Sequence, residues 1–247
     1  MADRPHRDFR RSTLAYLLMA LTVLQFGYPI TLHGRTWTAL YMAAYGVLGL
    51  SGIRVIQEGD DDVPRSPFIS LAILMGAAAA WFTASQHDVV ARTLMLLSVG
   101  LFQLALLVTL ARYILRSHRA GTGSSLILAA VSAYLLLGGV FGVAANLLET
   151  RSPGSFVDNS TSGLPLVWQG LQYQSYVTLT TLGYGDVLPV SPWARSLTTL
   201  ESVIGVLFLA IVIARLVGSP TDEAPAAGPD AVGSGPSEPG RPAPESD

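Results

Sequence analysis

The sequence predicts an all-α membrane protein with six transmembrane helices and a re-entrant segment between the fifth and the sixth. The 247-residue chain is 50% hydrophobic and only 13% charged, with a mean hydropathy of +0.45. Such a composition is typical of membrane proteins. A transmembrane helix needs about 20 mostly apolar residues. Runs of about this length occur at 12–32, 36–55, 66–86, 89–111, 121–148 and 193–217.

A further apolar stretch, 165–181, is too short and too polar to cross a membrane and return. Irregular backbone is tolerated at membrane depth only where protein buries it. Pro165 suits the first turn of a helix, and about 15 residues rising about 1.5 Å each reach the middle of the membrane near Thr180. We therefore expect a short re-entrant helix whose C-terminal carbonyls favour a cation.

The arginines predict a multi-pass protein of the cell membrane with both chain ends in the cytoplasm. All 15 basic residues are arginines. Eleven lie on the side of the two ends and four on the opposite side, and cytoplasmic segments carry the excess of positive charge. Under this topology the tryptophans all fall at the outer interface, as an aromatic belt would: Trp37, Trp81, Trp168 and Trp193.

Three parts are predicted along the chain. Residues 1–119 form a four-helix membrane domain, and residues 120–218 form a helix, re-entrant segment and helix. Residues 219–247 contain seven prolines and four glycines, a composition that favours a disordered tail. This tail is too short for a ligand-binding domain, so a cytoplasmic regulator would have to be another protein.

Several functional classes are disfavoured. The net charge of −2 gives no reason to expect a nucleic-acid partner. No arrangement of nucleophile and base is present, and we expect neither an enzyme nor a bound cofactor. The acidic run 58–62 matches no defined calcium-binding loop, which favours a solvated connection.

The most informative motif is Thr180-Thr181-Leu182-Gly183-Tyr184-Gly185-Asp186. Glycine adopts backbone conformations that other residues resist, so Gly183 and Gly185 allow the carbonyl groups of this segment to face one axis. Rings of carbonyl oxygens can replace the hydration shell of a potassium ion, as the filters of potassium channels do. The expected potassium ligands are Thr181, Leu182, Gly183 and Tyr184, followed by Gly185, and Thr181 can add its hydroxyl.

The region from about 121 to 218 resembles the pore domain of tetrameric potassium channels, particularly bacterial members of the two-helix pore family. The resemblance rests on Ser175 to Asp186, which is similar to that family's pore helix and filter; residues 1–119 match only in their number of spans. It implies a homotetramer in membrane lipid and passive potassium permeation, with potassium as the permeant ion. Two alternatives are a non-selective cation channel and a non-conducting sensor or scaffold built on a pore fold.

The segment departs from the family pattern around the filter. Leu182 replaces a usual valine, and its side chain is expected to face the pore helix. Tyr173 and Gln174 stand where many members carry two tryptophans. In the family the aspartate at the position of Asp186 commonly bonds a pore-helix aromatic, so we expect the Tyr173 hydroxyl to take that role.

Two residues of the last apolar run are candidate functional residues. Glu201 is an ionisable residue deep within a span, which marks it as functional by default. Contact with Thr178 or Gln174 behind the filter is favoured over a direct effect on permeation. Gly205 lies 19 residues after Asp186, where the resemblance implies a hinge; close helix packing is an equal alternative.

The same run and the fourth one bear on gating. The resemblance implies that the cavity is lined by Val206, Leu209 and Ile213, which would form a hydrophobic constriction able to close by dewetting. Residues 93–111 contain no charge, whereas a voltage sensor gains about 2.3 kcal/mol per charge per 100 mV. We therefore predict weak or absent voltage gating.

Overall fold

The computed structural model describes residues 11–34, 36–41, 43–45, 66–85, 88–116, 123–160 and 166–217. The expected span 36–55 is described only at 36–41 and 43–45, and both pieces are helical. The acidic run 58–62 and the predicted tail 219–247 lie outside the described residues.

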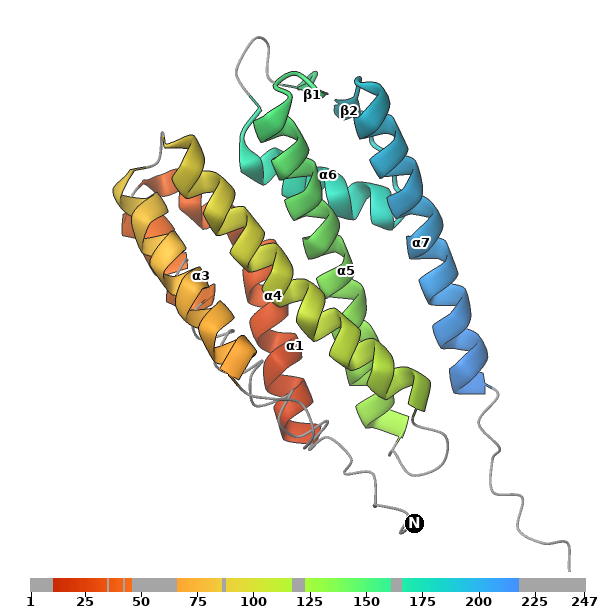
Figure 1. Cartoon of the computed structure of the whole chain (residues 1–247). Coiled ribbons are helices and arrows are strands. Elements are labelled where there is room, and N and C mark those ends of the chain that lie inside the picture. The colour runs from red at the N-terminus through yellow and green to blue at the C-terminus, as the bar shows by residue number, and fades with distance from the viewer. Residues whose placement is uncertain are drawn as a thin grey trace, which may run out of the picture.

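The described chain is almost entirely helical (Figure 1). Helices α1, α3 and α5 run toward the end that carries the two short strands, and α4 and α7 run back from it. The elements are α1 (Arg11–Phe26), the 3-10 helix η1 (Tyr28–His33), α3 (Ser66–Ala84), α4 (Val89–Arg116), α5 (Gly123–Arg151), β1 (Phe156–Asp158), α6 (Trp168–Leu179), β2 (Val187–Pro189) and α7 (Pro192–Val217).

The first apolar run is not one continuous α-helix, contrary to the expectation for 12–32. Helix α1 ends at Phe26, and η1 follows after Gly27. Pro29 lies in the first turn of η1, where its missing N–H removes no hydrogen bond. A glycine followed two residues later by a proline therefore converts the end of this run into a tighter helix.

Three described helices are long and apolar enough to cross a membrane: Val89–Leu115, Ser124–Arg151 and Pro192–Arg215. The last two agree closely with the expected runs 121–148 and 193–217. Two shorter apolar helices, Arg11–Phe26 and Ala72–Trp81, accompany them. The prediction of six spans is thus supported by length and composition for three of them.

Helix α5 lies at the centre of the molecule and packs against α1, α4, α6 and α7. Leucines of α1 and the side chains of Phe102 and Leu106 in α4 join α5 in one buried cluster. Glycines on α5 permit the close approach of α6. A β-carbon on Gly138 would lie 2.4 Å from the Tyr176 ring, and one on Gly142 would lie 2.3 Å from an oxygen of Gln172.

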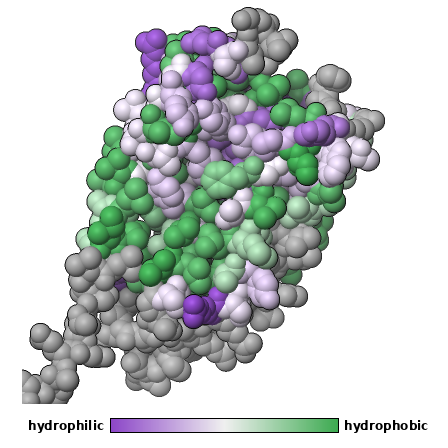
Figure 2. Space-filling view, turned by 180° about the vertical axis from the view of Figure 1, so that it is seen from behind, coloured by the Kyte–Doolittle hydropathy of each residue, from purple (hydrophilic) through white to green (hydrophobic). Residues whose placement is uncertain are grey.

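Helix α6 lies crosswise between α5 and α7 in the half of the molecule nearest the strands (Figure 1). Strands β1 and β2 pair in an antiparallel register that sets Val157 opposite Leu188. The segment between α5 and α6 therefore contains a strand, which pairs with the residues that follow positions 180–186, named the filter motif below. Figure 2 shows hydrophobic side chains across the middle of one face, with hydrophilic ones gathered mostly toward the strand end.

Candidate functional site

Every second residue of the filter motif, starting at Thr181, has a positive backbone φ angle. Thr181, Gly183 and Gly185 have positive φ angles of 58°, 60° and 76°. Glycine adopts this region freely, whereas a β-branched residue such as threonine resists it. A non-glycine residue in this region, such as Thr181, stores about 1–3 kcal/mol, and such residues cluster at functional sites.

The amide groups at the start of the motif point toward α6. The N–H of Thr181 donates to the carbonyl of Thr178 at 2.9 Å, and the N–H groups of Leu182 and Gly183 donate to the carbonyl of Val177 at 2.9 and 3.3 Å. In a trans peptide plane, an N–H and the preceding residue's carbonyl point in opposite directions. The carbonyls of residues 180–182 are therefore directed away from α6, where they can act as ligands.

The larger side chains of the motif are not buried within the chain. Leu182 is 55% exposed and Tyr184 is 66% exposed. The expectation that Leu182 faces the pore helix is thus not met by its own chain.

Asp186 ties the end of the motif to α6 and to the segment between α5 and α6. The Tyr173 hydroxyl donates to Oδ2 of Asp186 at 2.8 Å, which is the contact expected from the sequence. The carbonyl of Asp186 accepts the N–H of Asn159 at 2.8 Å, next to β1. The filter motif is therefore held at both ends, by α6 before it and by the paired strands after it.

Helix α6 is fixed to α5 by hydrogen bonds from side chains to backbone carbonyls. The Ser175 hydroxyl donates to Gly138 at 2.7 Å, and the Tyr176 hydroxyl donates to Leu135 at 2.7 Å. The Tyr134 hydroxyl of α5 donates to the carbonyl of Leu179 at 3.1 Å. These contacts hold the last turns of α6, from which the filter motif emerges.

Glu201 lies behind α6 but contacts a different residue from those expected. Its side chain is only 4% exposed, and its Oε1 is hydrogen-bonded to the hydroxyl of Ser175. Thr178 and Gln174 instead bond each other, at 3.1 Å. The expected location behind the filter agrees with the structure, and the partner differs because Ser175 lies on the side of α6 that also faces α5.

Gly205 lies where α7 meets the end of α6. A β-carbon at Gly205 would lie 2.6 Å from the carbonyl oxygen of Leu179, so a larger residue would separate the two helices. Close packing is thus a property of Gly205, and its role as a hinge stays a prediction. The predicted cavity residues Val206, Leu209 and Ile213 are 53%, 43% and 59% exposed within one chain.

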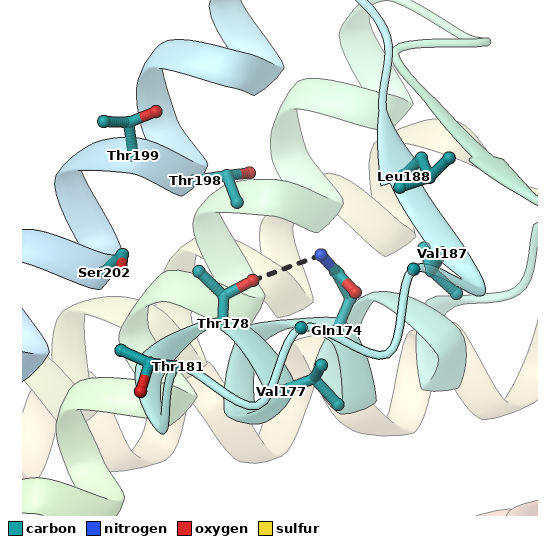
Figure 3. A pocket seen from close by; sticks show the side chains of 11 residues that line it. Gln174, Val177, Thr178, Thr181, Val187, Leu188, Thr198, Thr199 and Ser202 are labelled. Carbon is teal, nitrogen blue, oxygen red and sulfur yellow. Dashed lines mark hydrogen bonds between the residues drawn. The ribbon is translucent and has the colours of Figure 1, made fainter.

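A hollow of about 410 Å³ opens beside the motif. Figure 3 shows that its walls come from α6, from α7 and from the motif itself. Most of the labelled side chains carry hydroxyl or amide groups: Gln174, Thr178, Thr181, Thr198, Thr199 and Ser202. No group of three or more histidine, cysteine, aspartate or glutamate side chains suited to a metal occurs within the described residues.

The sequence reasoning missed the residues that anchor α6. Tyr134 belongs to no motif that distinguishes it from ordinary helix residues, and Ser175 belongs to the segment that resembles a pore helix but had no predicted partner. One available signal was the pair Gly138 and Gly142, because small residues four positions apart allow close helix contact in membranes.

Comparisons with known proteins agree with this geometry. Residues 130–220 match the protein-family model described as "Ion channel". An 82-residue segment is 33% identical to the inward rectifier potassium channel Kirbac3.1 of Paramagnetospirillum magnetotacticum and covers 32% of this chain. The chain spans about a quarter (24%) of that curated relative's length. No solved structure gives a significant match.

Residues 130–220 are therefore an ion channel pore domain within a multi-pass membrane protein, and this family consists of channels rather than enzymes. The domain is distantly related to that of an inward rectifier potassium channel. The segment that matches the family model, residues 130–220, includes α6, the filter motif and α7, together with most of α5.

Proposed function

We propose that the protein is a potassium-selective channel in which the carbonyls of Thr181, Leu182, Gly183 and Tyr184 replace the water around the ion. The backbone of the filter motif carries this proposal. Its alternating φ angles and its amides bonded to α6 direct consecutive carbonyls away from the supporting helix. Carbonyl rings of this kind are the ligands of potassium filters.

The proposed functional unit is a homotetramer, because one chain contributes a single filter motif and a carbonyl ring requires four. Two observations support an assembly through this face. The side chains of Leu182 and Tyr184 are largely exposed, and only 11% of the α7 span is buried within the chain, compared with 61% of the α5 span. The other three copies would cover these surfaces, with lipid around the periphery.

In the proposed topology six helices span the cell membrane and both chain ends are cytoplasmic. Helix α4 then lies where a voltage sensor would carry its charges. Residues 93–111 within it are uncharged, so the membrane field has almost nothing to move. We infer weak or absent voltage gating, with an opening stimulus acting elsewhere.

The proposed gate is the cytoplasmic half of α7. Val206, Leu209 and Ile213 would form a hydrophobic cavity below the filter, and bending near Gly205 would widen or narrow it. Narrowing an apolar constriction expels water and stops ion flow.

Ion flux from lipid vesicles tests the proposed function. Purified protein reconstituted in vesicles should release potassium quickly down its gradient and release sodium much more slowly. Equal release of both ions would support a non-selective channel, and release of neither would support a non-conducting sensor or scaffold.

A further inference from the structure

Glu201 places an ionisable carboxyl group in a buried, apolar part of the molecule. Its carboxyl group is buried within α7, at 4% exposure, in a span rich in apolar residues. An ionised carboxylate is costly there unless a positive charge or several donors compensate it. Ser175 is its hydrogen-bond partner in the described structure.

The groups that face Glu201 from the neighbouring helices are neutral. Among the described residues, Tyr134 of α5 and Tyr176 of α6 are the titratable groups near enough to interact electrostatically with it. Both phenols already donate their protons to backbone carbonyls, those of Leu179 and Leu135. A phenol is never positively charged, so neither group can balance a carboxylate, and neither has a second hydrogen to donate to it.

The hydroxyl group of Ser175 has two hydrogen-bond partners but only one hydrogen, and this determines the protonation state of Glu201. The Ser175 oxygen lies 2.7 Å from the carbonyl oxygen of Gly138 and also bonds Oε1 of Glu201. A serine hydroxyl has one hydrogen to donate, and a carbonyl can only accept. If Ser175 donates to Gly138, the contact with Glu201 needs a hydrogen from the carboxyl group.

We propose that Glu201 is a neutral carboxylic acid and a positioning residue for the filter. It donates to Ser175 of α6, and Ser175 donates to Gly138 of α5, so one chain of hydrogen bonds joins α7, α6 and α5. Two residues after Ser175, the carbonyl of Val177 accepts the amides of Leu182 and Gly183. The chain of bonds thus fixes the turn of α6 that holds the filter. This inference rests on the proposed function only for its effect on ion selectivity.

The consequence for pH has a definite sign. Removing the proton from Glu201 leaves two acceptors, the carboxylate and the carbonyl of Gly138, competing for the single hydrogen of Ser175. One of the three helices then loses its bond. The supported filter therefore exists while the acid keeps its proton and is weakened as the pH rises.

Infrared spectroscopy tests the protonation directly, without ion flux. The wild-type protein in lipid at neutral pH should show the C=O stretching band of a neutral carboxylic acid. Glu201→Gln should remove that band, whereas the control Asp88→Asn should keep it. Asp88 caps α4, accepting the N–H of Val90 at 2.8 Å, and asparagine caps helices as well as aspartate does.

Ion flux then tests the positioning role. Glu201→Gln keeps a neutral donor toward Ser175, so its potassium-to-sodium flux ratio should equal that of the wild type at neutral pH. The ratio of the wild type should fall at alkaline pH, and that of Glu201→Gln should not. Ser175→Ala breaks the chain of bonds and should lower the ratio by roughly tenfold, about the equilibrium effect of one buried hydrogen bond.

Two results would overturn the inference. An acid band that is missing in the wild type, or that keeps its full intensity in Glu201→Gln and so belongs to another carboxyl group, would show that Glu201 does not carry the proton. A wild-type flux ratio that stays constant into the alkaline range would show that the proton does not position the filter. If Glu201→Gln fails to fold, the wild-type band and its shift in Ser175→Ala decide the question. If the wild type conducts no ions, the proposed function is wrong, and the infrared measurement still tests the protonation of Glu201 independently.

Discussion

At the scale of single residues, the filter motif depends on backbone conformations that few residues adopt. Gly183 and Gly185 adopt positive φ angles without strain, and Thr181 is held in one by its N–H bond to Thr178. The motif is therefore not stable by local preference alone. It relies on α6 before it and on the contacts of Asp186 at its end.

The bond between Tyr173 and Asp186 gives the first prediction. Tyr173→Phe removes a 2.8 Å hydrogen bond and should destabilise the filter by about 1 kcal/mol, because the Asp186 carboxylate loses a donor. Potassium flux should then decay faster during sustained conduction. The control Tyr16→Phe removes a hydroxyl from a side chain of α1 that is 66% exposed and should decay like the wild type. Equal decay of Tyr173→Phe and the control would show that this bond does not support the filter.

The unusual backbone of Gly183 and Gly185 could be predicted from the residues of the motif, but the partner of Glu201 could not. The motif is local: seven consecutive residues determine which backbone conformations are allowed. The contact between Ser175 and Glu201 joins residues 26 positions apart, and it depends on how α6 and α7 are rotated about their axes. Sequence periodicity gives Glu201 a face of its own helix but not the residue opposite to it.

At the scale of elements, long apolar helices were easier to predict than short or interrupted ones. The bounds of α5 and α7 follow their apolar runs closely, because length and hydropathy together determine a span. The three-residue strands β1 and β2 are too short to show the alternation of a strand. The end of α1 at Phe26 depends on Gly27 and Pro29, which an average hydropathy does not register.

Gly205 gives a prediction about the contact between α6 and α7. Gly205→Ala places a β-carbon 2.6 Å from the carbonyl oxygen of Leu179, so it should lower thermal stability and reduce potassium flux. Gly76→Ala is a matched control in α3, where a β-carbon would meet nothing within 4 Å. Alanine favours a helix by about 1 kcal/mol over glycine, so this control should melt at the same or a higher temperature. A Gly205→Ala protein as stable as Gly76→Ala would contradict the packing role.

Helix α1 and the 3-10 helix η1 are joined directly to α6 by buried polar contacts. The Gln172 amide of α6 donates to Gln25 of α1 at 2.9 Å, and the Gln169 amide donates to Thr31 of η1 at 2.9 Å. The rings of Phe26 and Tyr176 lie 5.1 Å apart. The predicted boundary at residue 119 therefore crosses a continuous set of contacts, and its status as a domain boundary stays a prediction.

A double-mutant cycle measures this connection. Gln25→Leu and Gln172→Leu should each lower the free energy of unfolding in micelles, because each leaves a buried amide without its partner. The double variant should lose less than the sum of the two, with a coupling near 0.6 kcal/mol, as is usual for interhelical hydrogen bonds in membranes. Strictly additive losses would show that the two amides do not stabilise each other.

At the scale of the whole molecule, one chain supplies a single filter motif, and the proposed pore needs four. The span of α7 is 11% buried, and the side chains of Leu182 and Tyr184 in the filter motif are largely exposed. A second, third and fourth copy would cover both. The contacts within one chain therefore explain how the filter motif is held, and the proposed assembly would enclose the ion.

The assembly gives a prediction of mass. Protein extracted in lipid nanodiscs should contain four chains of 26.2 kDa each, measured by native mass spectrometry after release from the lipid. Since the sequence has no cysteine, single cysteines introduced at Leu209 should cross-link neighbouring chains near the pore axis. Cysteines introduced at exposed Leu101 on α4, which is 53% exposed, should not. A monomer or dimer would remove the basis for a carbonyl ring.

Selection of potassium by the backbone carbonyls of the filter motif can be measured as the reversal potential between potassium on one side of a bilayer and sodium on the other. The wild type should reverse far from zero, in the direction set by potassium. Gly183→Ala should reverse near zero, because alanine resists the φ of 60°. Gly154→Ala, at a φ of 84° between α5 and β1, should have the reversal potential of the wild type. A wild-type reversal potential at zero would contradict the account.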